Sequence, residues 1–371
     1  MKVWYYTLMP WPYAYGTIPY PFPAAHFDRA LAPGLYQGYL ELFRHAEDLG
    51  YDGIALAEHH STKIGTAPSP NLIAAAVAAQ TSRVTIAILG DCLPLHGHPL
   101  RLAEELAMID VLSNGRLVAG FIRGGGREYQ AYGVDIAQGR SMFEEAWDLI
   151  VKAWTEPEPF AWHGTHYHYD SVSILPRPIQ QPHPPVVAAA TTAESIEFAA
   201  RHHAPLFMGF APEQQIIEGF AYYRRFAETE CGWSPTSDDM GIIGPVYVSN
   251  SDASARSEAE AHMLVHYEEL ASLTQGALRA FTARRESERS YAYRSPATTA
   301  HEAPPRADYE TLSRQRYYVG SPDTVTRRLL EKKEKLGIGL FAGVTPFGSM
   351  EPAQARQSME LFAREVLPNL R

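Results

Sequence analysis

Hydrophobic residues along this chain occur as short unbroken runs, each followed by a segment with helical spacing. Unbroken apolar runs of this kind are typical of strands buried on both faces of a parallel sheet. The runs lie near residues 3, 54, 84, 117, 186, 206, 242 and 340. Each is followed by a helix, or by a loop and then a helix. Strict alternation of strand and helix over this length predicts a (β/α)8 TIM barrel with insertions.

Apolar residues at three- and four-residue spacing predict the helices. The clearest stripe consists of Phe143, Ala146, Trp147, Ile150 and Trp154. A doubly wound sheet is the alternative architecture with the same alternation. No Gly-x-Gly-x-x-Gly follows the first strand, so a dinucleotide-binding fold of the Rossmann type is not supported.

A proline- and aromatic-rich loop, residues 10–34, follows the first strand. Its prolines exclude regular helix or central strand. We predict an active-site loop in which Trp11, Tyr13 and Tyr15 form an apolar wall over a pocket, because long loops without regular structure are often functional. A surface loop that packs on itself is the alternative.

Two further segments interrupt the alternation within what we expect to be a single domain, residues 1–371. Residues 156–185 are predicted to be an insertion that contains a hairpin between Phe160 and Tyr169. Residues 275–316 are rich in Arg, Ser, Thr and Pro and have little periodicity. We predict a mobile lid there, and a solvated linker is the alternative.

The length, composition and net charge of the chain narrow the class of protein. A chain of 371 residues with 46% hydrophobic content suits one large α/β barrel or two modest domains. The net charge of −10 without a basic cluster argues against nucleic acid or an anionic membrane as partner. Two cysteines are too few for a disulfide scaffold, and no run approaches the ~20 apolar residues of a membrane span. We therefore expect a cytoplasmic protein.

The candidate chemistry lies where strands end, which is where a barrel enzyme carries its active site. The buried run from Gly53 to Ala57 is followed directly by Glu58, His59 and His60. A carboxylate beside imidazoles is suited to general acid–base catalysis. The alternative is that these are ordinary capped or core side chains.

Two other strand ends have the character of anion-binding sites. Arg123 and three glycines that begin with Gly124 follow one strand, where backbone N–H groups and a guanidinium can hold a phosphate. Thr192 and Ser195 lie at a predicted helix N-terminus, which favours an anion. Thr192 alone would suggest a plain N-cap. Both features together indicate a phosphorylated cofactor.

No metal site is predicted. His163, His166 and His168 are of the right type, but they lie in the predicted hairpin, where a hydrated surface is the better interpretation. A metal-dependent barrel hydrolase would need ligands from several strand ends, and the first strand supplies no histidine.

The residues at these strand ends belong to ordered blocks that match a known family. The blocks are Glu58-His59-His60-Ser61-Thr62-Lys63-Ile64-Gly65, Pro70-Asn71, Leu93-Pro94, His98-Pro99-Leu100-Arg101-Leu102-Ala103-Glu104, Asp110-Val111-Leu112-Ser113-Asn114-Gly115-Arg116 and Gly120-Phe121-Ile122-Arg123-Gly124. Their order closely resembles that of the bacterial luciferase-like flavin-dependent monooxygenases. The resemblance is strongest over residues 36–154. It is looser over 186–200 and from Gly320 onward.

The resemblance implies a barrel that uses reduced FMN and O2, with the flavin supplied by a separate NAD(P)H:flavin reductase, and a homodimer. It places the FMN phosphate at Arg123, Thr192 and Ser195, and His59 as the catalytic residue beside the isoalloxazine. The remaining residues that it places near the cofactor or the substrate are Leu89, Gly90, Asp91, Gly124, Thr191 and Glu58. It also implies a non-prolyl cis peptide within Leu89-Gly90-Asp91, and a lid at 275–316.

The chain departs from luciferase in three places. Thr191 stands where luciferase has a glutamate, and one residue is inserted between Leu93-Pro94 and His98-Pro99. The loop at 10–33 is much longer than in luciferase, so neither an aldehyde substrate nor light emission carries over.

We therefore expect a flavin-dependent monooxygenase that acts on a small to medium organic substrate. O2 would add at flavin C4a in a site kept dry by the loop and lid, with His59 as the acid–base group. One alternative is a dehydrogenase on the same barrel that uses the deazaflavin F420. Others are a non-catalytic flavin-binding or partner subunit and, less favoured, a metal-dependent hydrolase.

Overall fold

The computed structural model describes residues 1–14, 18, 20–284 and 308–371. They form two compact units. Unit 1 comprises Met1–Val3, Pro10–Gly16 and Ala190–Arg371, and unit 2 comprises Trp4–Met9 and Thr17–Ala189. Tyr15 and most of the predicted lid lie outside the described residues.

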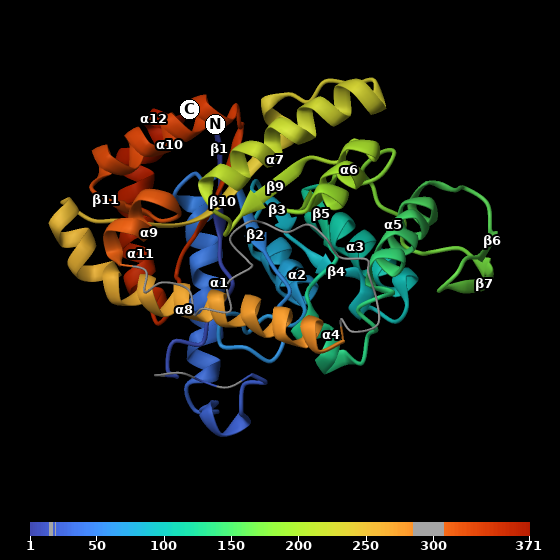
Figure 1. The fold of residues 1–371 in the computed structure, drawn as a ribbon, viewed down its shortest axis with the longest axis horizontal. Helices are drawn as coiled ribbons and strands as arrows, with labels where there is room; N and C mark the ends of the chain where they lie inside the picture. The colour runs from blue at the N-terminus through green and yellow to red at the C-terminus, as the bar shows by residue number, and fades with distance from the viewer. Residues whose placement is uncertain (15–17, 19, 285–307) are drawn as a thin grey trace. The chain divides into compact units, whose positions relative to one another are not determined.

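The sheet of unit 2 is parallel throughout (Figure 1). Strands pair in the order β1, β2, β3, β5 and β8, and β4 adds a short pairing to β5. Their bounds are β1 (Lys2–Tyr6), β2 (Gly53–Leu56), β3 (Thr85–Ile88), β4 (Asp91–Cys92), β5 (Leu117–Ile122) and β8 (Val186–Ala189). Because the ladders are parallel and in register, the residues that follow β2, β4 and β5 emerge at the same edge.

The sheet of unit 1 is also parallel and is built around β10 (Met240–Val248). All nine residues of β10 are buried. The strand has β9 (Leu206–Gly209) on one side and β12 (Leu340–Val344) on the other, while β11 (Tyr318–Gly320) pairs with its last residues. Because successive side chains of a strand point to opposite faces, burial of all nine residues means that both faces of β10 are covered, which explains its mostly apolar sequence.

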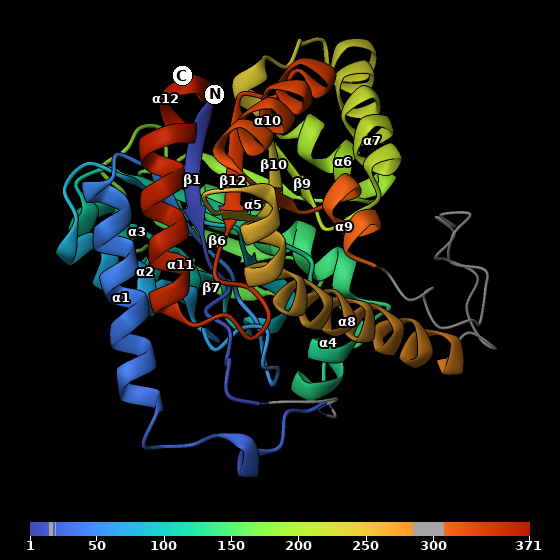
Figure 2. The ribbon, with the colours of Figure 1, turned by 90° about the vertical axis from the view of Figure 1, so that its left-hand side faces the viewer.

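The eight predicted strands are β1, β2, β3, β5, β8, β9, β10 and β12, and helices follow each of them along the chain (Figures 1 and 2). The helices are α1 (Ala32–Asp48), α2 (Pro70–Gln80), α3 (Pro99–Ser113), α4 (Gly126–Tyr132), α5 (Gly139–Thr155), α6 (Ala193–Arg201), α7 (Glu213–Phe226), α8 (Asp252–Arg284), α9 (Tyr309–Gln315), α10 (Pro322–Leu336), α11 (Pro352–Leu361) and α12 (Leu367–Leu370). The predicted (β/α)8 barrel is confirmed. No helix among the described residues combines the length and the apolar character needed to cross a bilayer.

The predicted apolar stripe is confirmed on α5, where all five of its residues are buried. Trp154 also donates its indole N–H to the carbonyl of Ala103 on α3 at 3.0 Å. A stripe at this spacing covers one face of a helix, so its burial anchors α5 on unit 2.

The hairpin predicted in the insertion is formed by β6 (Phe160–His163) and β7 (His168–Val172), which pair antiparallel. Its second strand ends at Val172, not at Tyr169 as predicted, because Val172 is buried and pairs with Phe160. Glu145 on α5 accepts backbone N–H groups from the hairpin turn. That carboxylate ties the insertion to the barrel.

Four strands and helices escaped prediction: β4, β11, α4 and α9. The strands β4 and β11 are two and three residues long, which is too short to show a periodic pattern. They are recognised only by their pairing with a neighbouring strand. Helix α4 begins within a glycine run that normally indicates a loop. Helix α8 also extends to Arg284, beyond the predicted end at Leu273.

Candidate functional site

A buried carboxylate–imidazole network lies where β2 and β4 end. Glu58 is 2% exposed. Its Oε1 accepts from His60 Nε2 at 2.6 Å, and its Oε2 accepts from the backbone N–H of Cys92 at 2.7 Å and from His96 Nε2 at 3.2 Å. Glu58, predicted to line the substrate pocket, thus has both carboxylate oxygens occupied by protein groups.

These contacts determine the charge of the network. Burial raises the pKa of Glu58, but the hydrogen bonds from His60, His96 and Cys92 outweigh it and lower the pKa to about 2. Burial lowers the pKa of His96, but the hydrogen bond to Glu58 and the nearby carboxylates raise it above its usual value overall. Glu58 is therefore an anion at neutral pH.

Asp91, the first residue of β4, has a different environment. It is fully buried, and neither of its carboxylate oxygens has a hydrogen-bond partner among the described residues. Burial raises its pKa well above the usual value. Burying a carboxylate without hydrogen-bond partners costs folding free energy, so the position of Asp91 requires an explanation.

His59, the predicted catalytic residue, lies opposite Glu128. The Nδ1 of His59 is 3.4 Å from Glu128 Oε1, and the same oxygen accepts the backbone N–H of His60 at 3.4 Å. A carboxylate accepts hydrogen bonds, so a hydrogen bond between these two groups places a proton of His59 on Nδ1. The side chain of His59 is 27% exposed, which leaves it accessible to a small molecule.

Helix α4 supplies two residues that the sequence analysis missed. Glu128 lies opposite His59, and the Tyr132 hydroxyl donates to His60 Nδ1 at 2.8 Å. The four-residue spacing of these two side chains, with Gly133 after them in the left-handed conformation, is a helical signal that could have identified α4.

Glycines permit close backbone approach at the ends of β3 and β5. A Cβ at Gly90 would lie 2.4 Å from the carbonyl oxygen of Gly120, and a Cβ at Gly124 would lie 2.1 Å from Cys92 Sγ. The peptide bond between Leu89 and Gly90 is cis, as the resemblance implies. The Arg123 guanidinium, on the same edge of unit 2, has a buried Nη1.

The second predicted anion site lies in unit 1. Thr192 is the N-cap of α6, and its hydroxyl donates to Ser195 Oγ at 3.0 Å. The carbonyl of Thr191 accepts from the side chain of Gln215 on α7 at 3.3 Å. Two hydroxyls beside the free N–H groups of a helix N-terminus suit a phosphate. Arg123 and Gly124 belong to unit 2, whereas Thr192 and Ser195 belong to unit 1.

Two aromatic residues at the start of the proline-rich loop pack together. Trp11 is 1% exposed, and Tyr13 packs edge-on against it with ring centroids 5.3 Å apart. Both were predicted to line the substrate pocket. The structure packs them against each other within unit 1.

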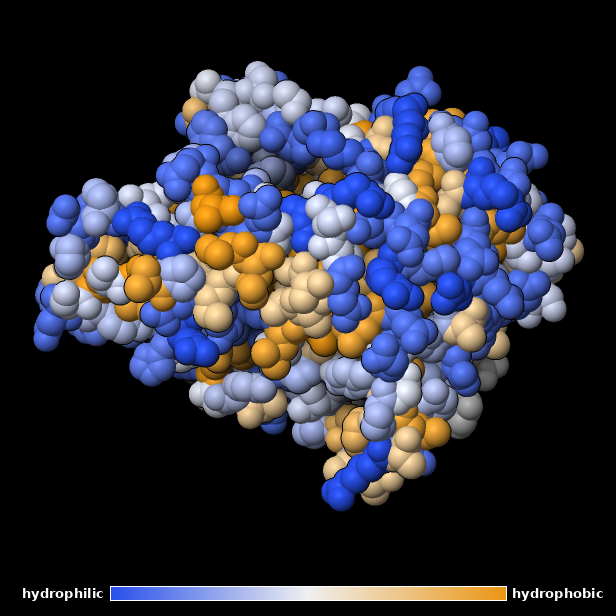
Figure 3. Space-filling model, turned by 180° about the vertical axis from the view of Figure 1, so that it is seen from behind, coloured by the Kyte–Doolittle hydropathy of each residue, from blue (hydrophilic) through white to orange (hydrophobic). Residues whose placement is uncertain are grey.

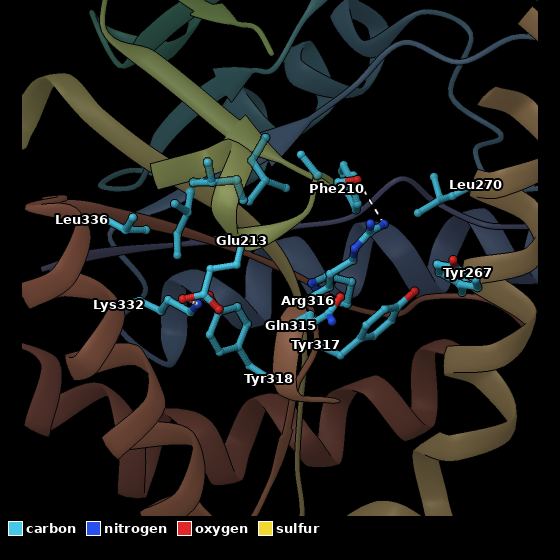
Figure 4. Close-up of a pocket in the computed structure, with 15 residues that line it drawn as sticks. Phe210, Glu213, Tyr267, Leu270, Gln315, Arg316, Tyr317, Tyr318, Lys332 and Leu336 are labelled. Carbon is cyan, nitrogen blue, oxygen red and sulfur yellow. Dashed lines mark hydrogen bonds and ion pairs between the residues drawn. The ribbon is translucent and has the colours of Figure 1, made fainter. Parts of the chain in front are cut away.

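A separate pocket lies in unit 1 (Figure 4). Arg316 projects into it, donating to the carbonyl of Phe210 at 3.4 Å and lying over the ring of Tyr267. Glu213 and Lys332 form an ion pair of 2.8 Å at its other end. None of the predicted site residues that the structure describes lines this pocket.

The chain matches a known protein family over most of its length. The sequence profile described as "Luciferase-like monooxygenase" matches residues 22–340. The oxygenase component of the flavin-dependent trigonelline monooxygenase from Acinetobacter baylyi is 28% identical over 241 residues, which are 62% of this chain and 64% of that protein. The chain spans about half the length of two other curated relatives, the protein y4wF from Sinorhizobium fredii and an alkanal monooxygenase alpha chain from Photorhabdus luminescens.

Solved structures extend the similarity to the whole chain. Monooxygenase RslO1 from Streptomyces bottropensis has a TM-score of 0.78 and 27% identity, with all of both chains covered. The oxygenating constituent of 3,6-diketocamphane monooxygenase from Pseudomonas putida, in complex with FMN, has a TM-score of 0.76. Its identity is 20%, with 99% of this chain and 98% of that chain covered. That similarity establishes the shared fold.

Proposed function

Because this chain belongs to the luciferase-like monooxygenase family, we propose that it is a flavin-dependent monooxygenase that uses reduced FMN and O2 to oxygenate a small to medium organic substrate. The observation that carries the proposal is the pair His59–Glu128 at the end of β2, within the segment that matches the family profile. When bound, reduced flavin supplies the electrons for oxygen activation.

The residues proposed to bind the cofactor are those whose chemistry fits its phosphate group and its ring. Arg123 and the glycine backbone at Gly124 suit an anionic phosphate in unit 2. Thr192 and Ser195 offer hydroxyls and a helix N-terminus in unit 1. Gly90 has no side chain, and its Cβ position is filled by the backbone of Gly120. The proposed place of the Leu89-Gly90-Asp91 backbone beside the flavin ring rests on the family resemblance.

His59 is proposed to hold or move the proton during oxygenation. Its Nδ1 faces Glu128, so the imidazole presents Nε2 as the basic nitrogen. Trp11 and Tyr13, with Tyr15 outside the described residues, are proposed to exclude water from the substrate side. Thr191, which precedes the N-cap of α6, is proposed to bind the cofactor beside Thr192.

The proposal includes three partners and a location. They are a small-molecule substrate, an NAD(P)H:flavin reductase that delivers reduced FMN, and a second copy of this chain. We propose that the protein acts in the cytoplasm.

Flavin titration tests the cofactor assignment. We expect the protein to bind FMN, and Arg123→Gln to weaken that binding about 10- to 100-fold, as expected for a lost charge-assisted hydrogen bond. Riboflavin lacks the phosphate, so its affinity should be the same in both proteins. An equal loss for FMN and riboflavin would contradict the phosphate role of Arg123.

The same titration distinguishes the proposed function from the two alternative functions. Binding of F420 without binding of FMN would favour an F420-dependent dehydrogenase on this barrel. Binding of FMN without oxygen-dependent turnover of any candidate substrate, in the presence of a flavin reductase, would favour a flavin-binding subunit without catalytic activity.

A further inference from the structure

Three side chains of metal-ligand type converge where β2 and β4 end. One carboxylate oxygen of Glu58, one of Asp91 and a ring nitrogen of His96 all lie within 4.8 Å of one another. Ligand atoms held ~2.1 Å from a metal are separated by roughly 3–4 Å. Glu58 Oε2 and His96 Nε2 already have such a separation, at 3.2 Å. Small side-chain movements would complete the set.

An independent observation at Asp91 points to a ligand. Both of its carboxylate oxygens are buried and lack a hydrogen-bond partner among the described residues. One of them lies in the three-residue cluster. Protein groups therefore satisfy Glu58 but leave Asp91 unsatisfied, although buried polar groups are normally paired. A cation would supply the missing partner.

We propose that Glu58, Asp91 and His96 bind a first-row transition-metal dication, such as Mn²⁺ or Zn²⁺. Two carboxylates balance the charge of a dication in a buried site. A donor set of two oxygens and one imidazole nitrogen suits these metals better than Mg²⁺, which prefers oxygen ligands and water. The side chain of His96 is 28% exposed and gives the metal access from solvent.

The surrounding contacts would orient the ligands. Glu58 Oε1 remains hydrogen-bonded to His60, whose other ring nitrogen accepts from Tyr132. Such outer contacts typically hold a ligating carboxylate in place. The inference concerns the protein's own side chains and does not rest on the proposed flavin chemistry.

Metal titration of the full chain tests the proposal. The protein is freed of metal with a chelator and then titrated with Mn²⁺, with bound ion measured by electron paramagnetic resonance. We expect one ion per chain. Pulsed measurements on the bound Mn²⁺ should detect the nitrogen of a single histidine.

Matched variants locate the ion. Asp91→Asn keeps the size of the side chain and His96→Gln keeps a polar group, and each should lower the affinity at least about tenfold. The control is the double variant His163→Ala and His168→Ala, which removes the exposed histidine pair of the hairpin and should leave the affinity unchanged.

Three outcomes would overturn the proposal. The first is that no ion binds at millimolar Mn²⁺ or Zn²⁺. The second is that Asp91→Asn leaves the metal affinity unchanged, and the third is that only the hairpin variant loses metal affinity. If the single variants fail to fold, wild-type titration and the histidine signal still decide. Absence of either shows that Asp91 is not a metal ligand.

Discussion

Glu58 and His59 are neighbours in the chain but have different surroundings. Side chains two residues apart in an extended segment point the same way, and Glu58 indeed bonds to His60 in the interior. His59 points elsewhere and meets Glu128, while its side chain stays 27% exposed. The division between a buried structural pair and an accessible imidazole follows from this alternation.

At the residue scale, His59→Ala should lower kcat about 10²- to 10⁴-fold, the usual contribution of a general acid–base group. FMN affinity should change little, since the assigned phosphate contacts are elsewhere. Steady-state kinetics with saturating reduced flavin and substrate measures the loss. The exposed His163→Ala variant is the control, and equal activity of both variants would contradict the catalytic role.

Glu128→Gln tests how His59 is oriented. The amide can still accept from Nδ1 but removes the charge, so we expect a smaller loss of kcat than for His59→Ala and a changed pH dependence of kcat. The pH–rate profile of the variant is the decisive measurement. An unaltered profile would show that Glu128 contributes only packing.

Gly124 provides a residue-scale test of stability. Its φ is +78° and a Cβ would lie 2.1 Å from Cys92 Sγ, so Gly124→Ala should lower the free energy of unfolding by about 1–3 kcal/mol. Gly125 has φ −137° and no atom within 4 Å of its Cβ position, so Gly125→Ala is the matched control. Urea denaturation compares the two, and equal stabilities would refute the steric argument.

At the scale of elements, Glu47 joins the end of α1 to the residues that precede β3. Its carboxylate accepts backbone N–H groups from Ser82, Arg83 and Val84 at 2.7 to 3.0 Å. Burial raises the pKa of Glu47, but these hydrogen bonds outweigh it and lower the pKa below its ordinary value. One side chain thus satisfies several amides of the connection into β3.

The lowered pKa gives this contact a pH dependence with a definite sign. The stabilisation is present above the unfolded-state pKa of 4.5 and is lost as the pH falls through the lower folded-state pKa. Glu47→Gln should therefore lower the free energy of unfolding by about 1–3 kcal/mol at pH 7, and by less below pH ~4. Exposed Glu331→Gln is the control. A pH-independent difference would exclude the charge as the cause.

At the scale of the whole molecule, apolar side chains gather on the face that carries α2 and α3 (Figure 3). Leu72 on α2 is 74% exposed, and Met108, Val111 and Leu112 on α3 are 43% to 59% exposed. Exposed apolar groups on two packed helices are typical of an interaction surface. A second copy of this chain is the partner that the resemblance implies.

Leu112→Glu should therefore convert a dimer into a monomer at micromolar concentration, because a charge on this face would be buried without a partner. Light scattering coupled to size-exclusion chromatography measures the mass. Leu330→Glu changes an exposed leucine on α10 and should leave the dimer intact. A monomeric wild-type protein, or a dimer unaffected by Leu112→Glu, would exclude this interface.

The sequence by itself determined the eight barrel strands and most of the helices, and it indicated the strand ends where we place the chemistry. Burial on both faces of a strand and on one face of a helix leaves a periodic signal in neighbouring residues. Hence the stripe on α5 and the position of His59 after β2 were predictable. The cis peptide at Leu89–Gly90 was implied by family resemblance and not by periodicity.

Only the tertiary structure decided which of these groups touch. Glu128 lies 69 residues from His59 in the chain, and His96 lies 38 residues from Glu58, so no local pattern could pair them. The unpaired carboxylate of Asp91 is likewise a product of packing, since its burial depends on what surrounds β4 and not on its own neighbours. Periodicity is a local property, whereas a site is made by long-range contacts, and the partners of Glu58, His59 and Asp91 emerge only when the strands assemble.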